Sequence, residues 1–579
     1  MSASEDQEEG RRDCLQQILD SSAQRKLIVA GPGTGKTHTF KALLERTGGP
    51  SLALTFINAL AADLADKLGD LAETYTFHGY CRRMLHTHAI GGVSTSVDYF
   101  PPLLALQADD LTRLSGDRVS GHDIEHEFHY LDESSSLIDA ALRSGDYYNA
   151  VGHLDSVYRV LRHFQANLGS IPTYRQVVVD EYQDFSLLEV NFIEIVTSHS
   201  PSLIVGDDDQ ALYGFKHASA EHIRTLAANS EYERFELPYC SRCTQVLVMA
   251  THAVIARATA IGRLNGRLDK RYECFLPVKQ ADSALHPKII HAKCTVERNS
   301  APYMGRYIYG RIDAISADDI GESRSEGYPT VLVIGPMQFA SRIYDYLAPG
   351  LADVKFKRST PIEISPIDAY KRLASNPNSR LGWRILLYLH PTMDANAILR
   401  RTLLDGEELE TLLSEVFRQR HLIVVALLQR FLNGDDLSPP ELASLEAAVE
   451  VSTQQLRDIL GKDDGQAPET PIVDQSAPSV VVTSLVGAKG LQASHVFVVG
   501  MNQGHFPHSN DSITDEEVCC LLVALTRATK SCTLVSCNRF GNQQVQPSAF
   551  MAWLAPYLST VDVNKAYFDG VASENAGRR

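Results

Sequence analysis

A short glycine-rich segment near the start constrains the fold more than any other feature of this sequence. Residues 26–30 read KLIVA, an apolar run typical of a buried strand, and residues 31–37 read GPGTGKT. The chain has helical character from about Lys36 onward. Strand, glycine-rich turn and helix in this order form the setting of a phosphate-binding P-loop. We therefore expect an α/β domain with a parallel sheet around this segment.

The residue types of this segment suit the binding of a nucleotide. Gly31, Gly33 and Gly35 allow the backbone to approach phosphate without a Cβ clash, and the helix N-terminus favours an anion. Lys36 is expected to reach the β- and γ-phosphates, and Thr37 to ligate Mg²⁺. A glycine-rich turn without a ligand is the alternative, and the full spacing argues against it.

An acidic pair follows a second apolar run. Residues 177–184 read VVVDEYQD, which predicts a buried strand ending at Asp180 and Glu181. The carboxyl ends of parallel strands meet at one edge of a sheet, so these carboxylates are expected beside the P-loop. Asp180 is assigned to the Mg²⁺ shell and Glu181 to the attacking water, as a general base. An acidic loop with no chemical role is the alternative.

Length and composition indicate a globular protein of several units. At 579 residues, and about 100–200 residues per domain, three to five units are expected. No apolar run reaches the roughly 18 residues of a membrane span. Residues 1–10 are acidic and polar, so a secretory signal is not expected. The ten cysteines are therefore expected to be reduced thiols of a cytoplasmic protein.

The net charge is −17, from 54 Lys and Arg against 71 Asp and Glu. Taken alone, this value argues against a nucleic-acid binder, because phosphate contacts need Lys and Arg. A local basic groove can still lie on an acidic chain. Any DNA role therefore has to rest on motifs.

Apolar runs predict two sets of buried strands, which suggests two α/β domains. The first set is 26–30, 51–56, 176–180 and 202–205; the second is 329–334, 479–484 and 495–499. Residues 394–460 have a helical pattern. Residues 316–328 are expected to form an exposed loop, and 463–479 a linker rich in Pro, Asp and Ser.

Two motifs carry a family resemblance. DEYQD at 180–184 and GDDDQALYGF at 206–215 resemble the UvrD/PcrA/Rep helicases of superfamily 1A. The resemblance runs in order through nearly the whole chain and is weakest in 91–170 and 391–477. It implies two RecA-like P-loop domains with parallel sheets, each with a mainly helical insertion, and ATP between them. It also implies Mg²⁺ and ATP-driven 3′→5′ movement on single-stranded or partly duplex DNA.

The resemblance assigns roles around the nucleotide. Gln210 matches the residue that senses the γ-phosphate, and Arg242 and Arg527 match two arginine fingers. Gln16 is chosen as the adenine-reading residue because it lies 20 residues before Lys36, with Gln17 and Gln7 as rivals. The catalytic residues are then Glu181, Gln210, Arg242 and Arg527; the metal ligands are Thr37 and Asp180; and the ATP contacts are Gln16, Gly31, Pro32, Gly33, Thr34, Gly35, Lys36, Thr37, Gly490 and Gln492.

The resemblance also assigns DNA contacts. Tyr213 and Phe215 match aromatics that stack on bases, and stacking contributes about 1–3 kcal/mol per base. Core packing is the alternative for both. The complete set of matched DNA contacts is Thr55, Phe56, Asn58, Thr76, Phe77, His78, Tyr213, Phe215 and Lys216.

Several positions depart from the family pattern. Ser241 stands where a Tyr stacks on adenine, with Tyr239 as a possible substitute, and Gln492 replaces the Glu that contacts ribose. Further departures replace basic residues or a His, and they are Ala59, Val486, Val518 and Cys519.

The predicted division of the chain has four parts. The first RecA-like domain takes 1–90 and 171–236, with insertion 91–170; the second takes 237–390 and 478–579, with insertion 391–477. The second insertion is short for the family, which resembles the helicase-like subunits beside OLD-type (TOPRIM) nucleases in Gabija anti-phage systems. A nuclease is therefore a candidate partner.

The sequence also allows other interpretations. Cys240 and Cys243, with Cys274 and Cys294 downstream, are either buried thiols or a Zn²⁺ site. A regulatory subunit that binds ATP beside a nuclease without moving on DNA is the competing function. A P-loop kinase or transporter ATPase leaves the DEYQD and GDDDQ motifs unexplained.

Overall fold

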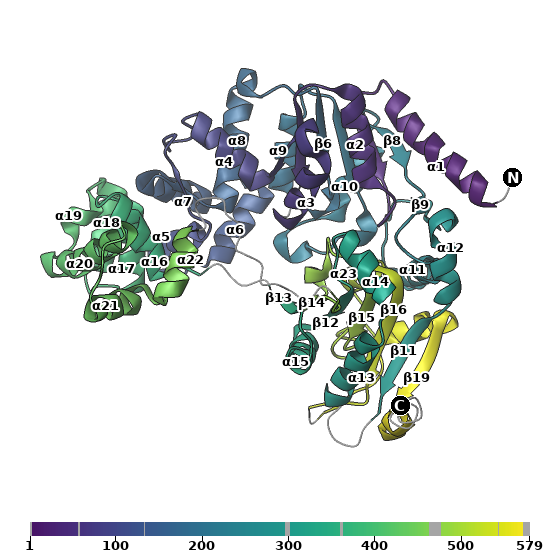
Figure 1. The fold of residues 1–579 in the computed structure, drawn as a ribbon. Coiled ribbons are helices and arrows are strands. Elements are labelled where there is room, and N and C mark those ends of the chain that lie inside the picture. Colours follow the sequence, from purple (N-terminus) through teal and green to yellow (C-terminus); the bar gives the residue numbers. More distant parts are fainter. Residues whose placement is uncertain are drawn as a thin grey trace.

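The chain folds around two parallel β-sheets, with a helical body to one side (Figure 1). The computed structural model describes residues 3–55, 58–132, 134–295, 301–358, 363–461, 476–541 and 543–570. We call the six-stranded sheet with its covering helices the first lobe, and the seven-stranded sheet with its helices the second lobe. No helix among these residues has both the length and the apolar character that a membrane crossing requires.

The sheet of the first lobe has the strand order β3-β2-β6-β7-β1-β8, and all its pairings are parallel. Its strands are β1 (Arg25–Val29), β2 (Ser51–Thr55), β3 (Glu73–Thr76), β6 (Gln176–Val179), β7 (Ser202–Gly206) and β8 (Glu233–Glu236). The P-loop follows β1, DEYQD follows β6 and GDDDQ follows β7. These three strands are neighbours, so the three motifs meet at one sheet edge.

Both faces of this sheet are covered, which explains its continuous apolar runs. Side chains alternate along β1: Leu27 and Val29 belong to one core, and Ile28 and Ala30 to the other. The covering helices include α1 (Ala3–Asp20), α2 (Lys36–Thr47), α3 (Asn58–Leu68), α4 (Phe77–Thr87), α9 (Leu187–Val196) and α10 (Ala220–Ala228).

The sheet of the second lobe has the order β13-β14-β12-β15-β16-β11-β19 and is also parallel. Its strands are β11 (Ile289–Cys294), β12 (Val331–Gly335), β13 (Val354–Lys357), β14 (Val480–Ser484), β15 (Ala493–Val499), β16 (Ala528–Cys537) and β19 (Leu558–Val563). Helices on its two faces include α11 (Gln245–Ala260), α13 (Ala301–Asp313), α15 (Met337–Leu347) and α23 (Asp515–Leu525).

The predicted strands are confirmed, but six strands of the two sheets were not predicted. They are the edge strands β3, β8, β13 and β19 and the inner strands β11 and β16. β8 reads ERFE and β3 reads ETYT, and both are partly exposed at sheet edges, so neither has an apolar run. The loop predicted at 316–328 is wrong. Ser316 caps helix α14 (Ala317–Ser325) by accepting from Asp319 N, and Ile320 anchors the helix in the protein. Asp318, Glu322 and Ser325 lie on its exposed side, whereas Ser323 is buried. Of the predicted linker 463–479, residues 463–475 lie outside the described part of the chain.

Helices from both insertions share one hydrophobic core, which defines the helical body. From the first predicted insertion it contains α5 (Leu103–Ser115) and α7 (Ser136–Tyr148). From the second it contains α18 (Ala395–Asp405), α19 (Leu409–Leu412), α20 (Glu415–Leu432), α21 (Pro439–Val449) and α22 (Thr453–Gly461). The two helices before the second insertion, α16 (Pro366–Ser375) and α17 (Arg380–Leu389), belong to the helical body as well. α16 and α17 precede residue 391, yet they pack within this body (Figure 1).

The helical body also contains a buried ion pair across the two insertions. Arg384 of α17 is fully buried, and its Nε and Nη2 donate to Asp110 and Asp109 of α5 at 2.8 and 2.5 Å. At the edge of the same contact, Arg372 pairs with Asp98. The two insertions are therefore joined by specific charges as well as by apolar packing.

Candidate active site

A cleft between the two lobes contains most of the predicted site. Lys36, Thr37, Asp180 and Glu181 line it from the first lobe, and Arg527 lines it from the second. The cleft has a volume of about 820 Å³ and opens to solvent. A small-ligand site typically takes about 300–1,000 Å³, so the cleft has room for a nucleotide.

The P-loop has the backbone that its glycines permit. Gly33 and Gly35 have φ of 73° and 94°, in the left-handed region, and Lys36 begins α2. Thr34 Oγ1 donates to Gly31 O at 2.9 Å and closes the loop. A Cβ on Gly33 would lie 2.4 Å from Cβ of Arg242. The loop is therefore shaped for phosphate and is in close contact with the segment that carries Arg242.

The carboxylates of Asp180 and Glu181 lie next to the P-loop. Glu181 Oε1 is 3.6 Å from Lys36 Nζ, and Gln183 Nε2 donates to Glu181 Oε2 at 2.7 Å. Burial raises the pKa of Asp180 to about 6, and the neighbouring Glu181 acts in the same direction. Burial opposes ionisation of Glu181 too, but Lys36 and Lys489 lower its pKa to about 2. Glu181 is therefore held as an ion, as a base requires.

Gln210 lies at the centre of a hydrogen-bond network that joins the lobes. Its Nε2 donates to Asp207 Oδ2 at 2.7 Å, and its Oε1 accepts from Arg527 Nη2 at 3.0 Å. Lys489 Nζ donates to Gln210 O at 2.7 Å and to Asp184 Oδ1 at 2.7 Å. Gln210 thus contacts two cations of the second lobe directly, Arg527 and Lys489.

Two guanidinium groups face the cleft. Burial lowers the pKa of Arg527 to about 10, and the nearby positive charge of Arg242 acts in the same direction. Within the described chain, Nε of Arg242 is buried and has no hydrogen-bond acceptor. Two like charges and an unsatisfied donor fit a site for a polyanion such as a triphosphate.

The structure brings most of the predicted nucleotide contacts to the cleft, but not Gln16. Its amide donates to Asp20 at 2.8 Å on the exposed side of α1. The rival Gln7 donates to Cys274 O and accepts from Leu276 N, so its amide is already satisfied. Gly490 and Gln492 line the cleft as predicted.

The predicted DNA contacts have different environments. Tyr213 lines the cleft, and the Nζ atoms of Lys216 and Lys489 lie 5.6 and 5.4 Å from its ring centroid. In contrast, Phe77 is a core residue that packs edge-to-face on Phe185 at 4.7 Å.

The other predicted DNA contacts are local backbone and packing positions. Thr76 caps α4 by accepting from Gly79 N, and the His78 ring packs on His153. Thr55 is fully buried. Phe56 and the side chains of Asn58 and Phe215 lie outside the described part of the structure.

The thiols do not form the Zn²⁺ site that was weighed. Cys240 and Cys243 contact Tyr272 in one core, whereas Cys294 lies in a different core of the second lobe. Among the described residues, the single cluster of three candidate metal ligands is Asp207–Asp209. The four cysteines of that candidate site are buried free thiols, in agreement with the alternative given above.

Three residues of the network were not singled out from the sequence. Gln183 links Glu181 to Asp207 N, Asp207 holds Gln210, and Lys489 crosses between the lobes. Gln183 and Asp207 lie inside the DEYQD and GDDDQ motifs, and Lys489 directly precedes the predicted ATP contact Gly490. What was missing was the partner of each side chain.

The fold and this site define an ATP-hydrolysing enzyme of the P-loop class, built from two RecA-like domains. Two family models match the chain: an AAA domain over residues 16–216, and a UvrD-like helicase C-terminal domain over residues 446–539.

Curated relatives agree with these matches. The chain is 22% identical to DNA helicase II of Salmonella typhimurium, over 94% of this chain and 87% of that protein. It is 25% identical to ATP-dependent DNA helicase UvrD1 of Mycobacterium bovis (87% and 79% covered) and 22% identical to ATP-dependent DNA helicase PcrA of Staphylococcus aureus (87% and 80%). Together, these matches support a UvrD-like superfamily 1 DNA helicase.

Proposed function

We propose that this helicase couples ATP hydrolysis to 3′→5′ movement along single-stranded DNA. The observation that carries the proposal is the position of Gln210. It bonds Arg527 of the second lobe, and it lies three residues before Tyr213, whose ring lines the same cleft. A change at the γ-phosphate would therefore reach both the lobe contact and a base-stacking ring.

In this proposal the cleft residues have separate roles in ATP binding and hydrolysis. Lys36 and the P-loop amides bind the β- and γ-phosphates. The Thr37 hydroxyl and the Asp180 carboxylate are oxygen ligands of the kind that Mg²⁺ prefers, and a bound Mg²⁺ would neutralise phosphate charge. Glu181 orients and deprotonates the attacking water. Arg242 and Arg527 stabilise the charge that develops on the γ-phosphate.

The charge of the cleft supports DNA binding by an acidic protein. Its lining carries eight cationic and four acidic residues, whereas the whole chain has a net charge of −17. Several of the cations lie away from the P-loop, toward the rim. They are Lys67, Lys216, Lys357 and Arg358. A strand of phosphates is the ligand that such a rim attracts.

Steady-state ATP hydrolysis with and without single-stranded DNA tests the proposal. Wild type should be stimulated by DNA, Glu181→Gln should be inactive while still binding ATP, and Tyr213→Ala should lose most of the stimulation. The control is Tyr346→Ala, on α15 and away from the cleft. A wild-type rate unaffected by single strands would overturn the proposal. Unwinding of duplexes with 3′ or 5′ tails would then test the direction.

A second candidate is an ATP-responsive regulatory subunit of a nuclease. Ser241 favours it, because this hydroxyl donates to Gly33 O at 3.1 Å in the position of the family's base-stacking Tyr. ATP binding without DNA-stimulated turnover, together with co-purification of a TOPRIM nuclease, would favour this function. A role in anti-phage defence belongs to the same hypothesis.

We also propose the division of the chain given above, namely two RecA-like domains with insertions at about 91–170 and 391–477. Helices α16 and α17 pack with the second insertion, so a boundary near Pro366 is the natural refinement of the proposed residue 391. Expression of residues 366–461 fused to residues 91–170 would test whether the helical body folds as one unit.

A further inference from the structure

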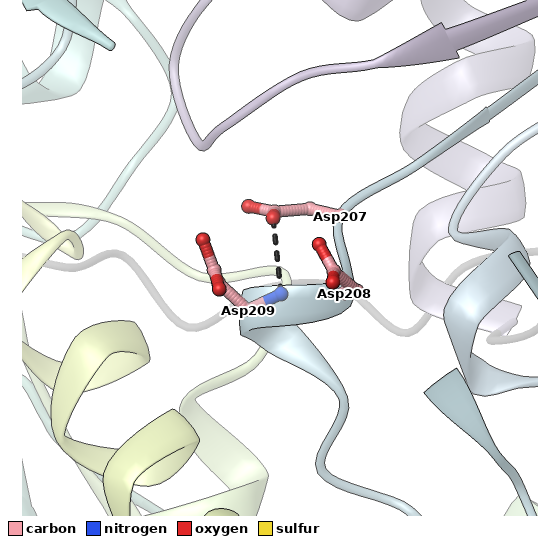
Figure 2. Close-up of side chains that lie close together, drawn as sticks. All are labelled: Asp207, Asp208 and Asp209. Atoms are coloured by element: carbon pink, nitrogen blue, oxygen red, sulfur yellow. Dashed lines mark hydrogen bonds between the residues drawn. The ribbon is translucent and has the colours of Figure 1, made fainter. Parts of the chain in front are cut away.

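Three consecutive carboxylates converge immediately after β7 (Figure 2). Asp207, Asp208 and Asp209 are all buried, and one oxygen from each lies within 4.8 Å of the others. Asp207 Oδ1 accepts from Asp209 N at 3.1 Å, which holds the turn in shape. Three buried carboxylates at this separation repel one another and require positive charge nearby.

The charge that they require is supplied by one lysine. Lys270 Nζ lies 2.7 Å from Asp207 Oδ1, 2.9 Å from Asp208 Oδ1 and 2.7 Å from Asp209 Oδ2, and the lysine is 8% exposed. Its ammonium therefore occupies the place that a metal ion would take among these carboxylates.

Two arginines complete the balance around the lysine. Arg267 pairs with Asp209 at 2.7 Å, and Arg224 pairs with Asp208 at 3.2 Å. Three cations thus face the three buried carboxylates and balance them without any ion from solution, and Arg224 also pairs with the exposed Glu221 at 2.6 Å. The carboxylates serve to hold the Lys270 segment.

The segment that carries Lys270 connects the two lobes. It follows α11, which packs with α23 in the core of the second lobe. Leu264 lies in that core, and its N–H donates to Asp515 of α23. Four residues later, Leu268 N donates to Asp208 Oδ2 at 2.8 Å and the Leu268 side chain packs on the core of the first lobe. The chain therefore passes from one lobe to the other within these residues.

Asp207 connects this crossing to the cleft. It holds the Gln210 amide through Oδ2, and its N–H donates to Gln183 Oε1 at 2.8 Å, while Gln183 also bonds Glu181. Lys270 is therefore linked to Gln210 through the single side chain of Asp207, by one ion pair and one hydrogen bond.

We propose that Lys270 is a positioning residue for ATP turnover. By neutralising Asp207, it keeps that carboxylate in place to orient Gln210, at the point where the chain crosses between the lobes. The inference rests on the proposed role of Gln210 at the γ-phosphate, and it adds a residue outside the cleft's chemistry to the coupling of the lobes.

Substitution Lys270→Met tests this, because Met has a similar length and no charge. We expect kcat for ATP to fall about tenfold or more and KM for ATP to change less than about twofold, since only turnover needs an oriented Gln210. The matched control is Lys279→Met. That lysine is also 8% exposed and pairs with Asp282, but it contacts Thr529 O of the second lobe, away from Gln210.

Two further variants separate positioning from general loss of stability. In Lys270→Met the cluster keeps three carboxylates against two arginines, so adding Asp208→Asn restores neutrality and should recover at least about threefold of the lost kcat. In a double-mutant cycle, Lys270→Met should cost almost nothing further when Gln210→Ala is already present.

An unchanged kcat in Lys270→Met, an equal loss in Lys279→Met, or full additivity with Gln210→Ala would each overturn the proposal. If Lys270→Met fails to fold, the Lys270→Met, Asp208→Asn chain is compared with Asp208→Asn alone. The basal rate without DNA is sufficient for every arm. A protein that hydrolyses ATP but ignores DNA would therefore refute the motor proposal and leave this one measurable.

Discussion

At the scale of single residues, the site depends on close approach of the two lobes at the P-loop. Gly33 has a left-handed φ of 73°, and its Cα faces Arg242 and Cys240 with no room for a side chain. Ser241 N also donates to Gly33 O at 2.9 Å. The glycine thus serves two needs at once, the turn of the loop and contact with the segment of the arginine finger.

Substitution Gly33→Ala is predicted to impair turnover. The new Cβ would lie 2.4 Å from Arg242 Cβ, so Arg242 has to move away from the phosphates. We expect a fall of about tenfold or more in kcat, which corresponds to at least about 1.4 kcal/mol of transition-state stabilisation. Gly48→Ala is the control: its φ is also positive, at 63°, but nothing lies within 4 Å. Equal rates for both variants in an ATPase assay would contradict the prediction.

At the scale of elements, the helices of the two insertions act as one packed body. The core shared by α5, α7 and α16 to α22 is apolar, and the buried Arg384 fixes the relative position of α17 and α5. A buried ion pair with good geometry adds specificity, and loss of one partner leaves an uncompensated charge.

Arg384→Met is therefore predicted to loosen the helical body, because it leaves Asp110 buried without its cation. The expected loss is about 3–5 kcal/mol of local stability. Thermal unfolding would detect this loss of stability, and limited proteolysis would detect it as early cleavage within 366–461. Arg400→Met is the control, since Arg400 is exposed and donates only to Leu114 O across a similar contact. Identical proteolysis of both variants would argue against a special role for Arg384.

The helical body is also predicted to lose stability in acid through His421. Burial lowers the pKa of His421 to about 4, and the nearby His390 and Arg420 act in the same direction. In the unfolded chain its pKa is near 6.5, so the unfolded state binds the extra proton between these values. Stability therefore falls as the pH drops from about 6.5 toward 4, by up to about 1.4 kcal/mol per pH unit.

The effect of His421 is measured by urea unfolding at several pH values. His421→Gln should flatten the dependence in this window, because glutamine does not titrate. Tyr370→Phe is the control, since it removes the hydroxyl bonded to His421 Nδ1 at 2.8 Å without removing the imidazole. If the slope of His421→Gln equals that of wild type, the assignment to His421 fails.

At the scale of the whole molecule, charge is distributed unevenly between surface and cleft. The chain carries −17, while the cleft lining has twice as many cations as acids. Binding of single-stranded DNA through this lining should weaken steeply with salt, because each phosphate contact releases a counterion. The same unevenness keeps the remaining surface from binding nucleic acid non-specifically.

Lys216→Ala is predicted to reduce the salt dependence of DNA binding. Lys216 is exposed at the cleft rim, and loss of one phosphate contact should lower the slope of log K against log [salt] by about 0.7. Fluorescence anisotropy with a labelled single strand at several salt concentrations measures this slope. Lys565→Ala is the control, because Lys565 is an exposed cation that does not line the cleft. A parallel shift for both variants would rule out a local contact.

Much of this architecture is readable in the amino-acid order alone. The apolar runs KLIVA, VVVD and SLIV predict strands that are covered on both faces. The motifs GPGTGKT and DEYQD predict the phosphate-binding loop and the acidic groups at the ends of two of these strands. These are short-range features, in which the residues that make a strand or a phosphate loop are neighbours in the chain. The edge strands β3 and β8 and helix α14 were not predicted because their half-exposed faces dilute the apolar signal. The inner strands β11 and β16 were not predicted because polar residues interrupt their apolar residues, as the letters IIHAKC and ATKSCTLVSC show.

The partners of the functional side chains depend on contacts across hundreds of residues, and folding alone sets these. Nothing in GDDDQ indicates that Lys270 neutralises its aspartates, or that Gln210 bonds Arg527, which is 317 residues away. The spacing that suggested Gln16 likewise failed to place it at the cleft, because spacing fixes distance along the chain and not direction in space. Phe77, which the family resemblance suggested as a DNA contact, packs in the core instead. The chemical groups of each motif are thus determined by residues that are adjacent in the sequence. The contacts that connect these motifs form only in the tertiary structure, where the two lobes meet.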